Sequence, residues 1–231
     1  MGENGLVDGA VAANDFLAKL GPAAAAEFER LGARRRFPAG ATVFLEGDQA
    51  HEAFLLLGGE VKASVGSADG REIVLDVFEP GCLLGELSVI DGRPRSASLV
   101  ALSTVEVLAV AAGPFNEFLD RHPQALRHLL VEVVDRLRTR VRHQMEFGAG
   151  DALGRVCARL VELAERHGET VDGTVALRSP VSQADLAAWT GLSREAVVKA
   201  LRTLRQLGWI QSQGRNITIT DADQVRRRAV H

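Results

Sequence analysis

The sequence predicts an α+β protein in three parts: a β-rich roll, a long helix, and a small C-terminal module of helices and a hairpin. Short β-rich runs bounded by Gly, Pro and Asp occupy residues 35–110. A helical pattern with an apolar seam follows over residues 114–147, and two capped helices flank Gly191. The chain has 231 residues, of which 46% are hydrophobic and 25% charged, and this suits two modest folded domains.

Composition argues against several classes of protein. No apolar run reaches the roughly 18 residues of a membrane span, and residues 1–14 lack the basic and apolar regions of a signal peptide. The two cysteines, Cys82 and Cys157, match no metal or disulfide spacing, so we expect buried thiols in a reducing cytoplasm. The sequence has no nucleophile–base pair, metal-ligand cluster or Walker loop, so we expect neither an enzyme nor a metal-binding protein.

The net charge of −3 is divided unevenly along the chain. Residues 1–150 carry 15 Lys and Arg against 21 Asp and Glu, which gives −6, whereas residues 151–231 carry 12 against 9, which gives +3. The positive excess therefore lies in the C-terminal part, where it would favour contacts with nucleic-acid phosphates.

The first part of the chain is expected to form a helical region followed by a roll of short strands. Residues 15–31 have an amphipathic helical pattern, and Ala68-Asp69-Gly70-Arg71 predicts a hairpin turn. Turn residues recur about every 8 to 12 positions, as in small barrels and jelly rolls. The expected strands are Thr42–Leu45, Ala53–Leu57, Glu60–Val65, Glu72–Phe78, Leu83–Leu84, Ala97–Ala101 and Val105–Val110.

The segment 85–97 combines the groups that bind a nucleotide. Backbone N–H groups of a short loop, the guanidinium of Arg95 and the hydroxyl of Ser96 can converge on phosphate oxygens. Glu86 would repel phosphate, but its carboxylate can accept hydrogen bonds from sugar hydroxyls. An acid for the ribose and a basic and hydroxyl pair for the phosphate predict a nucleotide pocket.

The helical pattern over Pro114–Phe147 predicts a partner helix. Pro123 suits the first turn of the long helix. Apolar residues spaced by four and three form a seam typical of coiled coils, namely Leu126, Leu130, Val133 and Leu137. Continuing the heptad reaches Arg140 and Gln144, whereas the 3.6-residue period brings Val141 and Met145 inward. The alternative is an amphipathic helix packed on its own domain.

A hinge is predicted after this helix. Gly148 and Gly150 lie close enough to break or loosen a helix, and Asp151 can cap the next helix, which extends to about His167. The alternative is a plain linker without a switching role.

The segment 181–201 predicts a helix-turn-helix. Ser182 and Ser193 can cap two successive helices, and Gly191 allows the left-handed backbone of the turn between them. The second helix has an apolar face made of Val197, Ala200, Leu201 and Leu204. The alternative is a helical pair with a charged outer face.

Charged residues of the second helix lie where a recognition helix meets base edges. Arg194, Glu195 and Lys199 project near its N-terminal half. The β-rich runs after Gly208 predict a winged hairpin. Three further arginines suit phosphate contacts, namely Arg202, Arg205 and Arg215.

These two motifs resemble those of the catabolite activator protein/FNR family of transcription regulators. Residues 85–97 resemble the phosphate-binding cassette of cyclic-nucleotide-binding domains, and residues 181–201 resemble the family's DNA-binding helices. The resemblance covers about residues 15–225. It implies an N-terminal jelly-roll-like β-roll that binds a cyclic nucleotide, a long dimerisation helix and a C-terminal winged helix-turn-helix. The implied boundaries are 1–113, 114–147 and 148–231.

The resemblance implies roles for the residues of the pocket. Glu86 would bind the ribose 2′-hydroxyl, and Arg95 and Ser96 would bind the cyclic phosphate. The backbone of the same segment would line the pocket around Gly85, Leu87, Ser88 and Ala97. Ser96 followed by Ala97 favours cAMP as the effector.

The base-contacting positions depart from the family's pattern. Family members carry a hydroxyl pair on the long helix that contacts adenine, and the matching positions here are Arg140 and Val141. Arg140 could stack on a purine or donate to a guanine carbonyl. The effector therefore stays open between cAMP, cGMP, another ligand and none. The alternative for Glu86 and Arg95 is an internal ion pair in an empty roll.

The resemblance also implies how DNA is recognised. Following the cap Ser193, Arg194 would contact guanine, Glu195 cytosine and Lys199 a second guanine, in a palindromic TGTGA-like site bound by a homodimer. Lysine lacks the planar fork of the arginine in the best-known member, which loosens discrimination. Expected partners are double-stranded DNA, a cyclic nucleotide and RNA polymerase, the last facing the loop Glu169–Thr174. A ligand-independent regulator with a vestigial or differently tuned pocket is the alternative.

Overall fold

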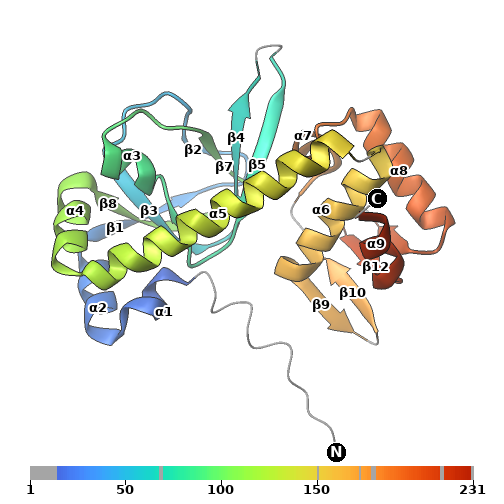
Figure 1. The fold of residues 1–231 in the computed structure, drawn as a ribbon. Coiled ribbons are helices and arrows are strands. Elements are labelled where there is room, and N and C mark those ends of the chain that lie inside the picture. Colours follow the sequence, from blue (N-terminus) through green and yellow to red (C-terminus); the bar gives the residue numbers. More distant parts are fainter. Residues whose placement is uncertain are drawn as a thin grey trace, which may run out of the picture. The chain divides into compact units, whose positions relative to one another are not determined.

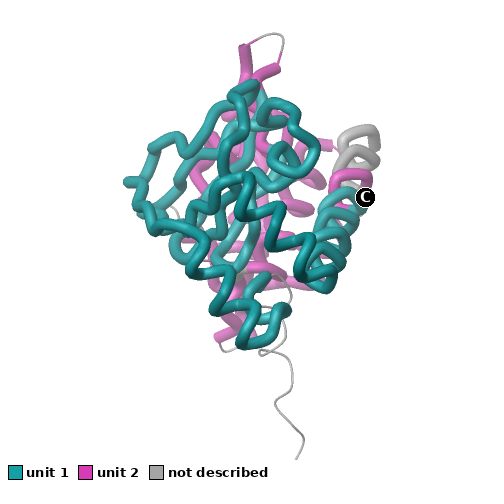
Figure 2. Tube along the Cα trace, turned by 90° about the vertical axis from the view of Figure 1, so that its left-hand side faces the viewer, with its two compact units in different colours: residues 1–65, 75–138 teal, residues 66–74, 139–231 magenta. Residues whose placement is uncertain are grey.

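The computed structural model describes residues 15–67, 70–149, 151–171, 173–177, 181–213 and 216–229. The chain divides into two compact units (Figure 2). Unit 1 comprises Met1–Val65 and Leu75–Arg138, and unit 2 comprises Gly66–Val74 and Thr139–His231.

Unit 1 begins with two short helices in place of one helical region. They are α1 (Phe16–Leu20) and α2 (Pro22–Arg30), shown in blue in Figure 1. Gly21 separates them with a φ of 76°, and Pro22 occupies the first turn of α2, where its missing N–H costs no hydrogen bond. The break lets Phe16 and Phe28 pack edge to face, with ring centroids 5.2 Å apart.

Two four-stranded sheets form the roll of unit 1 (Figure 1). The first has the order β1-β8-β3-β6, with β1 Gly32–Phe37, β8 Val105–Ala111, β3 Glu52–Gly58 and β6 Leu83–Leu84. The second has the order β2-β7-β4-β5, with β2 Thr42–Phe44, β7 Ser98–Ala101, β4 Val61–Gly66 and β5 Glu72–Phe78. All seven predicted strands are present, with small shifts at their ends. Of the predicted turn between β4 and β5, Ala68 and Asp69 lie outside the described residues.

Strand β1 was not predicted, because three consecutive arginines mask its pattern. Arg34 and Arg36 both bind Glu106 on the neighbouring strand at 2.9 Å, and Arg35 binds Glu52 at 2.5 Å. These hydrogen bonds from Arg36 and then Arg34 lower the pKa of Glu106. The partners come from distant parts of the chain, so the local sequence alone does not indicate the strand.

The core of unit 1 has two apolar clusters. One contains residues from both sheets, among them Leu56, Val61, Leu99 and Val107. The other lies under the helices and contains Phe28, Phe115 and Phe118, the last two on α4 (Ala112–Arg121).

Helix α5 (Pro123–Ala149) begins at the predicted proline. It continues through Gly148, where the sequence had predicted a break; Gly150 lies outside the described residues. Ala125, Leu129 and Val133 pack on the core of unit 1. The predicted seam is therefore only partly exposed. Its leucines are exposed, by 46% at Leu126, 61% at Leu130 and 60% at Leu137, whereas Val133 is half-buried and packs on the core.

After the end of α5, the next helix of unit 2 is α6 (Ala152–His167). The carboxylate of Asp151 caps this helix as predicted, because it accepts the N–H of Gly154 at 2.8 Å. Helices α7 (Gln183–Thr190), α8 (Arg194–Gln206) and α9 (Ala222–Ala229) follow.

A four-stranded sheet completes unit 2, in the order β11-β12-β10-β9. The predicted wing is present as β11 (Ile210–Gln213) and β12 (Asn216–Ile219). A second hairpin, β9 (Gly168–Val171) and β10 (Thr174–Leu177), occupies the segment that was expected to be a loop.

None of the described helices is both long and apolar enough to cross a membrane. The described part of the chain also contains no group of three or more His, Cys, Asp or Glu that could hold a metal ion.

Candidate functional site

The segment 85–97 contains a short helix rather than only a loop. Helix α3 (Glu86–Asp91) lies between two glycines with left-handed backbone, Gly85 and Gly92, each with a φ of 71°. Only glycine adopts this conformation readily, and a Cβ at Gly85 would also overlap the guanidinium of Arg95. The two glycines therefore set the bounds of α3 and bring Arg95 close to its first residue.

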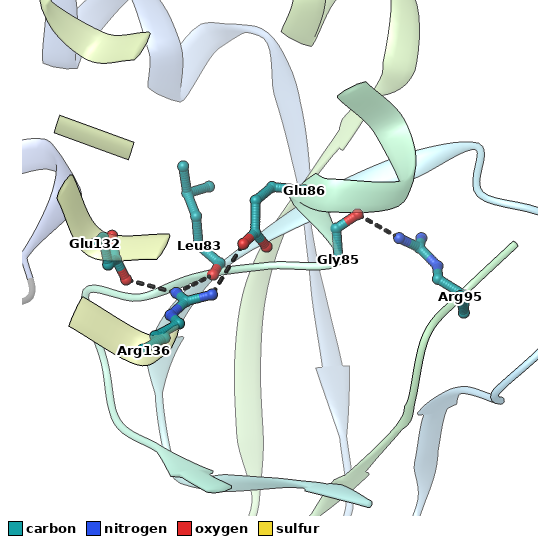
Figure 3. Close-up of polar contacts among 6 residues, drawn as sticks. All are labelled: Leu83, Gly85, Glu86, Arg95, Glu132 and Arg136. Atoms are coloured by element: carbon teal, nitrogen blue, oxygen red, sulfur yellow. Dashed lines mark hydrogen bonds and ion pairs between the residues drawn. The ribbon is translucent and has the colours of Figure 1, made fainter. Parts of the chain in front are cut away.

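Glu86 opens this helix and is almost completely buried, with 1% of its surface exposed. Its Oε1 accepts a hydrogen bond from Nη1 of Arg136 on α5 at 2.9 Å (Figure 3). The other arm of Arg136 donates to Glu132 at 2.5 Å and to the carbonyl of Leu83 at 2.8 Å. The ion pair that the sequence alternative assigned to Glu86 and Arg95 is thus formed by Glu86 and Arg136.

Burial and the arginine act in opposite directions on the carboxylate. Burial raises the pKa of Glu86 above its usual value, and the charge of Arg136 only partly offsets this. For Arg136, burial lowers the pKa, but the carboxylates of Glu86 and then Glu132 outweigh burial, and the pKa is raised. Arg136 is therefore the fixed charge of the pair, and Glu86 is the group that can change its protonation.

Arg95 lies on the opposite side of the start of α3 from Arg136 (Figure 3). It is 5% exposed, and its two terminal nitrogens donate to the carbonyls of Gly85 at 2.5 Å and Glu52 at 2.6 Å. Its Nε has no hydrogen-bond partner. Burial lowers the pKa of Arg95, whereas nearby carboxylates, chiefly Glu86, oppose the change. A buried cation with an unused N–H donor suits an anionic ligand.

The remaining predicted residues of the segment differ in their surroundings. Ser88 is buried and its hydroxyl donates to the carbonyl of Pro94 at 3.3 Å, so it supports the segment. Ser96 is exposed, and the side chain of Leu87 is 44% exposed. Ala97 is half-buried and packs on the apolar cluster between the sheets.

Arg140 is exposed on α5 and falls in unit 2, so its part in a pocket stays a prediction. Sequence reasoning missed Arg136 and Glu132, which lie one and two turns earlier on the same helix. Arg136 lies four positions before Arg140 and so on nearly the same side of the helix, and this spacing was the signal that could have indicated it.

The predicted helix-turn-helix is confirmed in its caps and its turn. The hydroxyl of Ser182 accepts the N–H of Asp185 at 3.1 Å, and Asp185 accepts the N–H of Ser182 at 3.0 Å, which completes a capping box. Gly191 has a φ of 65° between α7 and α8. The hydroxyl of Ser193 accepts the N–H of Ala196 at 3.2 Å and caps α8.

Helix α8 has one buried face and one charged face. The buried residues are Val197, Ala200, Leu201 and Leu204, as predicted. At about 100° per residue, the exposed charged side chains span only about 140° of the opposite face. They are Arg194, Glu195, Lys199, Arg202 and Arg205. A hydrogen bond from its own backbone N–H, and then one from Ser193, lowers the pKa of Glu195, which keeps it ionised as an acceptor.

One of the arginines predicted to contact phosphates has a described contact with the wing. Arg205 of α8 donates to the hydroxyl of Ser212 on β11 at 3.4 Å, which links the helix to the wing. Arg215 lies outside the described residues.

Comparison with known proteins places this site and these helices in one class. Residues 34–122 match the family model of the cyclic nucleotide-binding domain, and residues 154–228 match the Crp-like helix-turn-helix domain. The chain is therefore a DNA-binding transcription regulator that carries a cyclic-nucleotide-binding domain. It belongs to the CRP/FNR family of transcription regulators.

Individual relatives agree with this assignment. The CRP-like cAMP-activated global transcriptional regulator of Mycobacterium tuberculosis (strain H37Rv) is 32% identical over 193 residues, covering 84% of this chain and 86% of the relative. FixK2 from Bradyrhizobium japonicum has the same fold, with a TM-score of 0.76 and 22% identity over 85% of this chain and 96% of FixK2. The c-di-GMP responsive regulator CLP of Xanthomonas campestris has a TM-score of 0.74 and 24% identity over 85% of this chain and 97% of CLP.

Proposed function

We propose that this protein is a homodimeric, cytoplasmic regulator whose binding to a palindromic TGTGA-like DNA site is controlled by a cyclic nucleotide, with cAMP favoured. The observation that carries the proposal is the state of Arg95. Its guanidinium is buried, has no carboxylate partner among the described residues, and keeps an unpaired Nε–H. A cyclic phosphate would accept from that donor and compensate the buried charge. The name of the Mycobacterium tuberculosis relative supports cAMP as the effector.

In this proposal each residue of the pocket keeps the role that the sequence indicated. Glu86 accepts from the ribose 2′-hydroxyl, and Arg95 with Ser96 binds the phosphate. Arg140 meets the base. The backbone that encloses the ligand belongs to Gly85, Leu87, Ser88 and Ala97. We retain the division into 1–113 for the nucleotide domain, 114–147 for the dimer helix and 148–231 for the DNA-binding domain.

The Glu86–Arg136 pair offers a physical route from ligand to helix. A ribose hydroxyl that donates to Glu86 changes the acceptor that Arg136 contacts, and Arg136 belongs to α5. A ligand shifts a regulator between two states only by binding one of them more tightly. The strength of the ion pair between Glu86 and Arg136 would thus depend on whether a ligand is bound.

In the DNA-binding part, Arg194, Glu195 and Lys199 would contact base edges, while Arg202, Arg205 and Arg215 would contact phosphates. Two copies related by twofold symmetry would place two such helices on an inverted repeat. RNA polymerase is a further partner in this proposal, and the β9–β10 hairpin is the surface we assign to it.

Calorimetric titration of the protein with cAMP, cGMP and cyclic di-GMP tests the proposal. We expect micromolar binding of cAMP, and Arg95→Ala should weaken it at least about tenfold, because a charge-assisted contact is lost. Equal affinity in the wild type and Arg95→Ala would contradict the pocket assignment.

A second candidate function is a ligand-independent regulator with a vestigial pocket. The hydrogen bonds of Arg95 to the carbonyls of Gly85 and Glu52 favour it, since they partly satisfy the guanidinium without a ligand. DNA affinity that no cyclic nucleotide changes would support this alternative.

A further inference from the structure

Arg95 presents an electrostatic problem in unit 1. A buried guanidinium normally needs a carboxylate partner, because burying an unpaired charge is costly. Two backbone carbonyls accept from Arg95, but no carboxylate in the described part of the chain lies within ion-pair distance of it. More distant carboxylates, chiefly Glu86, offset the burial of this charge only in part, so a group in direct contact with the guanidinium is needed as well.

The aromatic ring of Phe44 fills that role. The Cζ of Arg95 lies over the ring at 4.2 Å from its centroid, well within the range of a cation–π contact. The ring is itself held by Phe54, at a centroid distance of 5.8 Å and an interplanar angle of 26°. Arg95 also lies 5.7 Å from the Phe54 ring, so the guanidinium covers a pair of stacked rings.

The pairing of β2 with β7 places Phe44 next to Arg95. Phe44 ends β2 and is opposite Leu99 of β7, and a bulge between Thr42 and Phe44 shifts the register of the two strands. Bulges re-aim side chains and are frequent beside binding sites. Arg95 precedes β7 by three residues, so the antiparallel pairing brings the ring and the guanidinium together.

An aromatic ring compensates a cation differently from a carboxylate. A carboxylate would accept the N–H groups of Arg95 and compete directly with a phosphate. The face of a ring attracts the charge without accepting those hydrogen bonds, so Nε–H stays available.

We propose that Phe44 is a positioning residue that holds the buried guanidinium of Arg95 over its ring and leaves the Nε–H donor for an anionic ligand. The inference rests on the proposed function for the identity of the ligand as a cyclic nucleotide. The contact itself is present without a ligand, so it can be tested separately.

The variants are Phe44→Leu, which removes the ring, and Phe44→Trp, which keeps an aromatic face. Phe37→Leu is the matched control, because Phe37 packs on the same apolar cluster and is likewise half-buried. The first readout is the arginine Nε–H resonances of the ligand-free protein in 1H–15N NMR spectra, with the Arg95 signal identified by its loss in Arg95→Lys. The second is calorimetric titration with cAMP.

We expect Phe44→Leu to move the Arg95 Nε–H resonance, because the ring current is lost, and to weaken cAMP binding about 5- to 30-fold. Phe44→Trp should stay within about threefold of the wild type, as the stronger cation–π partner. Phe37→Leu should change neither readout. Phe44→Leu and Phe37→Leu each remove one ring that packs on the same apolar cluster. An effect of Phe44→Leu alone therefore reflects the positioning of Arg95 and not a loss of packing.

Two other outcomes are distinguishable. If Arg95→Ala abolishes cAMP binding while Phe44→Leu leaves it unchanged, the role of Phe44 is overturned and the proposed function stands. If the wild type binds no cyclic nucleotide, the proposed effector falls. The NMR readout then decides on Phe44 alone: an Arg95 resonance that moves in Phe44→Leu but not in Phe37→Leu supports positioning, and one that moves in neither overturns it.

Discussion

Burial of Glu86 makes the stability of the fold depend on pH. Burial raises its pKa in the folded protein above the value in the unfolded chain, so the folded state holds the proton to higher pH. The stability that this provides is fully present below the unfolded-state pKa and is lost as the pH rises through the raised folded-state pKa. Ionised Glu86 thus stabilises the fold less than protonated Glu86.

Replacing Glu86 with Gln removes this titration and keeps an acceptor for Arg136. We expect the melting temperature of Glu86→Gln to rise relative to the wild type as the pH increases above the ordinary range of a glutamate. Differential scanning calorimetry of both proteins across that range measures the effect. Glu117→Gln, at an exposed glutamate of α4, is the control and should show no such trend. A difference in melting temperature between Glu86→Gln and the wild type that does not change with pH would contradict a raised pKa of Glu86 in the folded protein.

The sequence indicated the residues of the proposed pocket that lie within one segment, but it did not indicate the residues that the structure brings to them from elsewhere in the chain. Glu86 and Arg95 were predicted because their chemistry and spacing are local. Arg136 lies 50 positions from Glu86, and Phe44 approaches Arg95 from another strand. Such contacts are made by sheet pairing and by helix packing, and one sequence carries no local pattern for them.

At the scale of elements, capped helices were predicted best. The caps at Ser182 and Ser193 and the turn at Gly191 are satisfied within a few residues of each other, so the sequence determines them locally. Helix α3 was missed because it has only six residues, and the only signals at its ends are two glycines with left-handed backbone. Strand β1 was missed because acidic residues of other strands neutralise its arginines.

Helix α8 allows base contacts and phosphate contacts to be separated by mutation. Arg194 lies in its first turn and is exposed, so Arg194→Ala should cost about 1–3 kcal/mol of binding free energy on a TGTGA-like site and relax the choice at one base pair. Arg202→Ala, on the same charged face, should weaken binding about equally on all sequences and reduce its salt dependence. Fluorescence anisotropy with the consensus duplex and single-base variants, at several salt concentrations, measures both. Uniform weakening by Arg194→Ala would make Arg194 a phosphate contact.

At the scale of the whole molecule, α5 divides its apolar residues between two faces. Ala125, Leu129 and Val133 pack on unit 1, which is the arrangement expected of a helix on its own domain. Leu130 and Leu137 are seven residues apart and each is about 60% exposed, which is one heptad of a coiled-coil seam. The packing on unit 1 agrees with the alternative of a helix on its own domain, whereas the partner helix stays a prediction that the exposed leucines favour. An exposed leucine seam on a long helix favours a second copy of that helix as its partner.

Substituting Leu130→Glu and Leu137→Glu together should separate the proposed dimer. Each fully buried leucine contributes about 1.5–3 kcal/mol, and twofold symmetry removes every contact twice, so the dissociation constant should rise at least about a hundredfold. Sedimentation velocity measures the mass, which should fall from that of a dimer to that of a monomer. The affinity for the palindromic duplex should fall as the dimer dissociates. Gln124→Glu adds a charge to another face of α5 and should leave the dimer intact.

The fold of each chain should survive the double substitution, because both leucines are exposed in the single copy. Circular dichroism that matches the wild type would then assign the loss of palindrome binding to dissociation rather than to unfolding. Half-site binding at high protein concentration should persist, since the residues of α8 are untouched. A dimer that survives both substitutions would place the interface away from this seam and remove the basis for a twofold arrangement about α5.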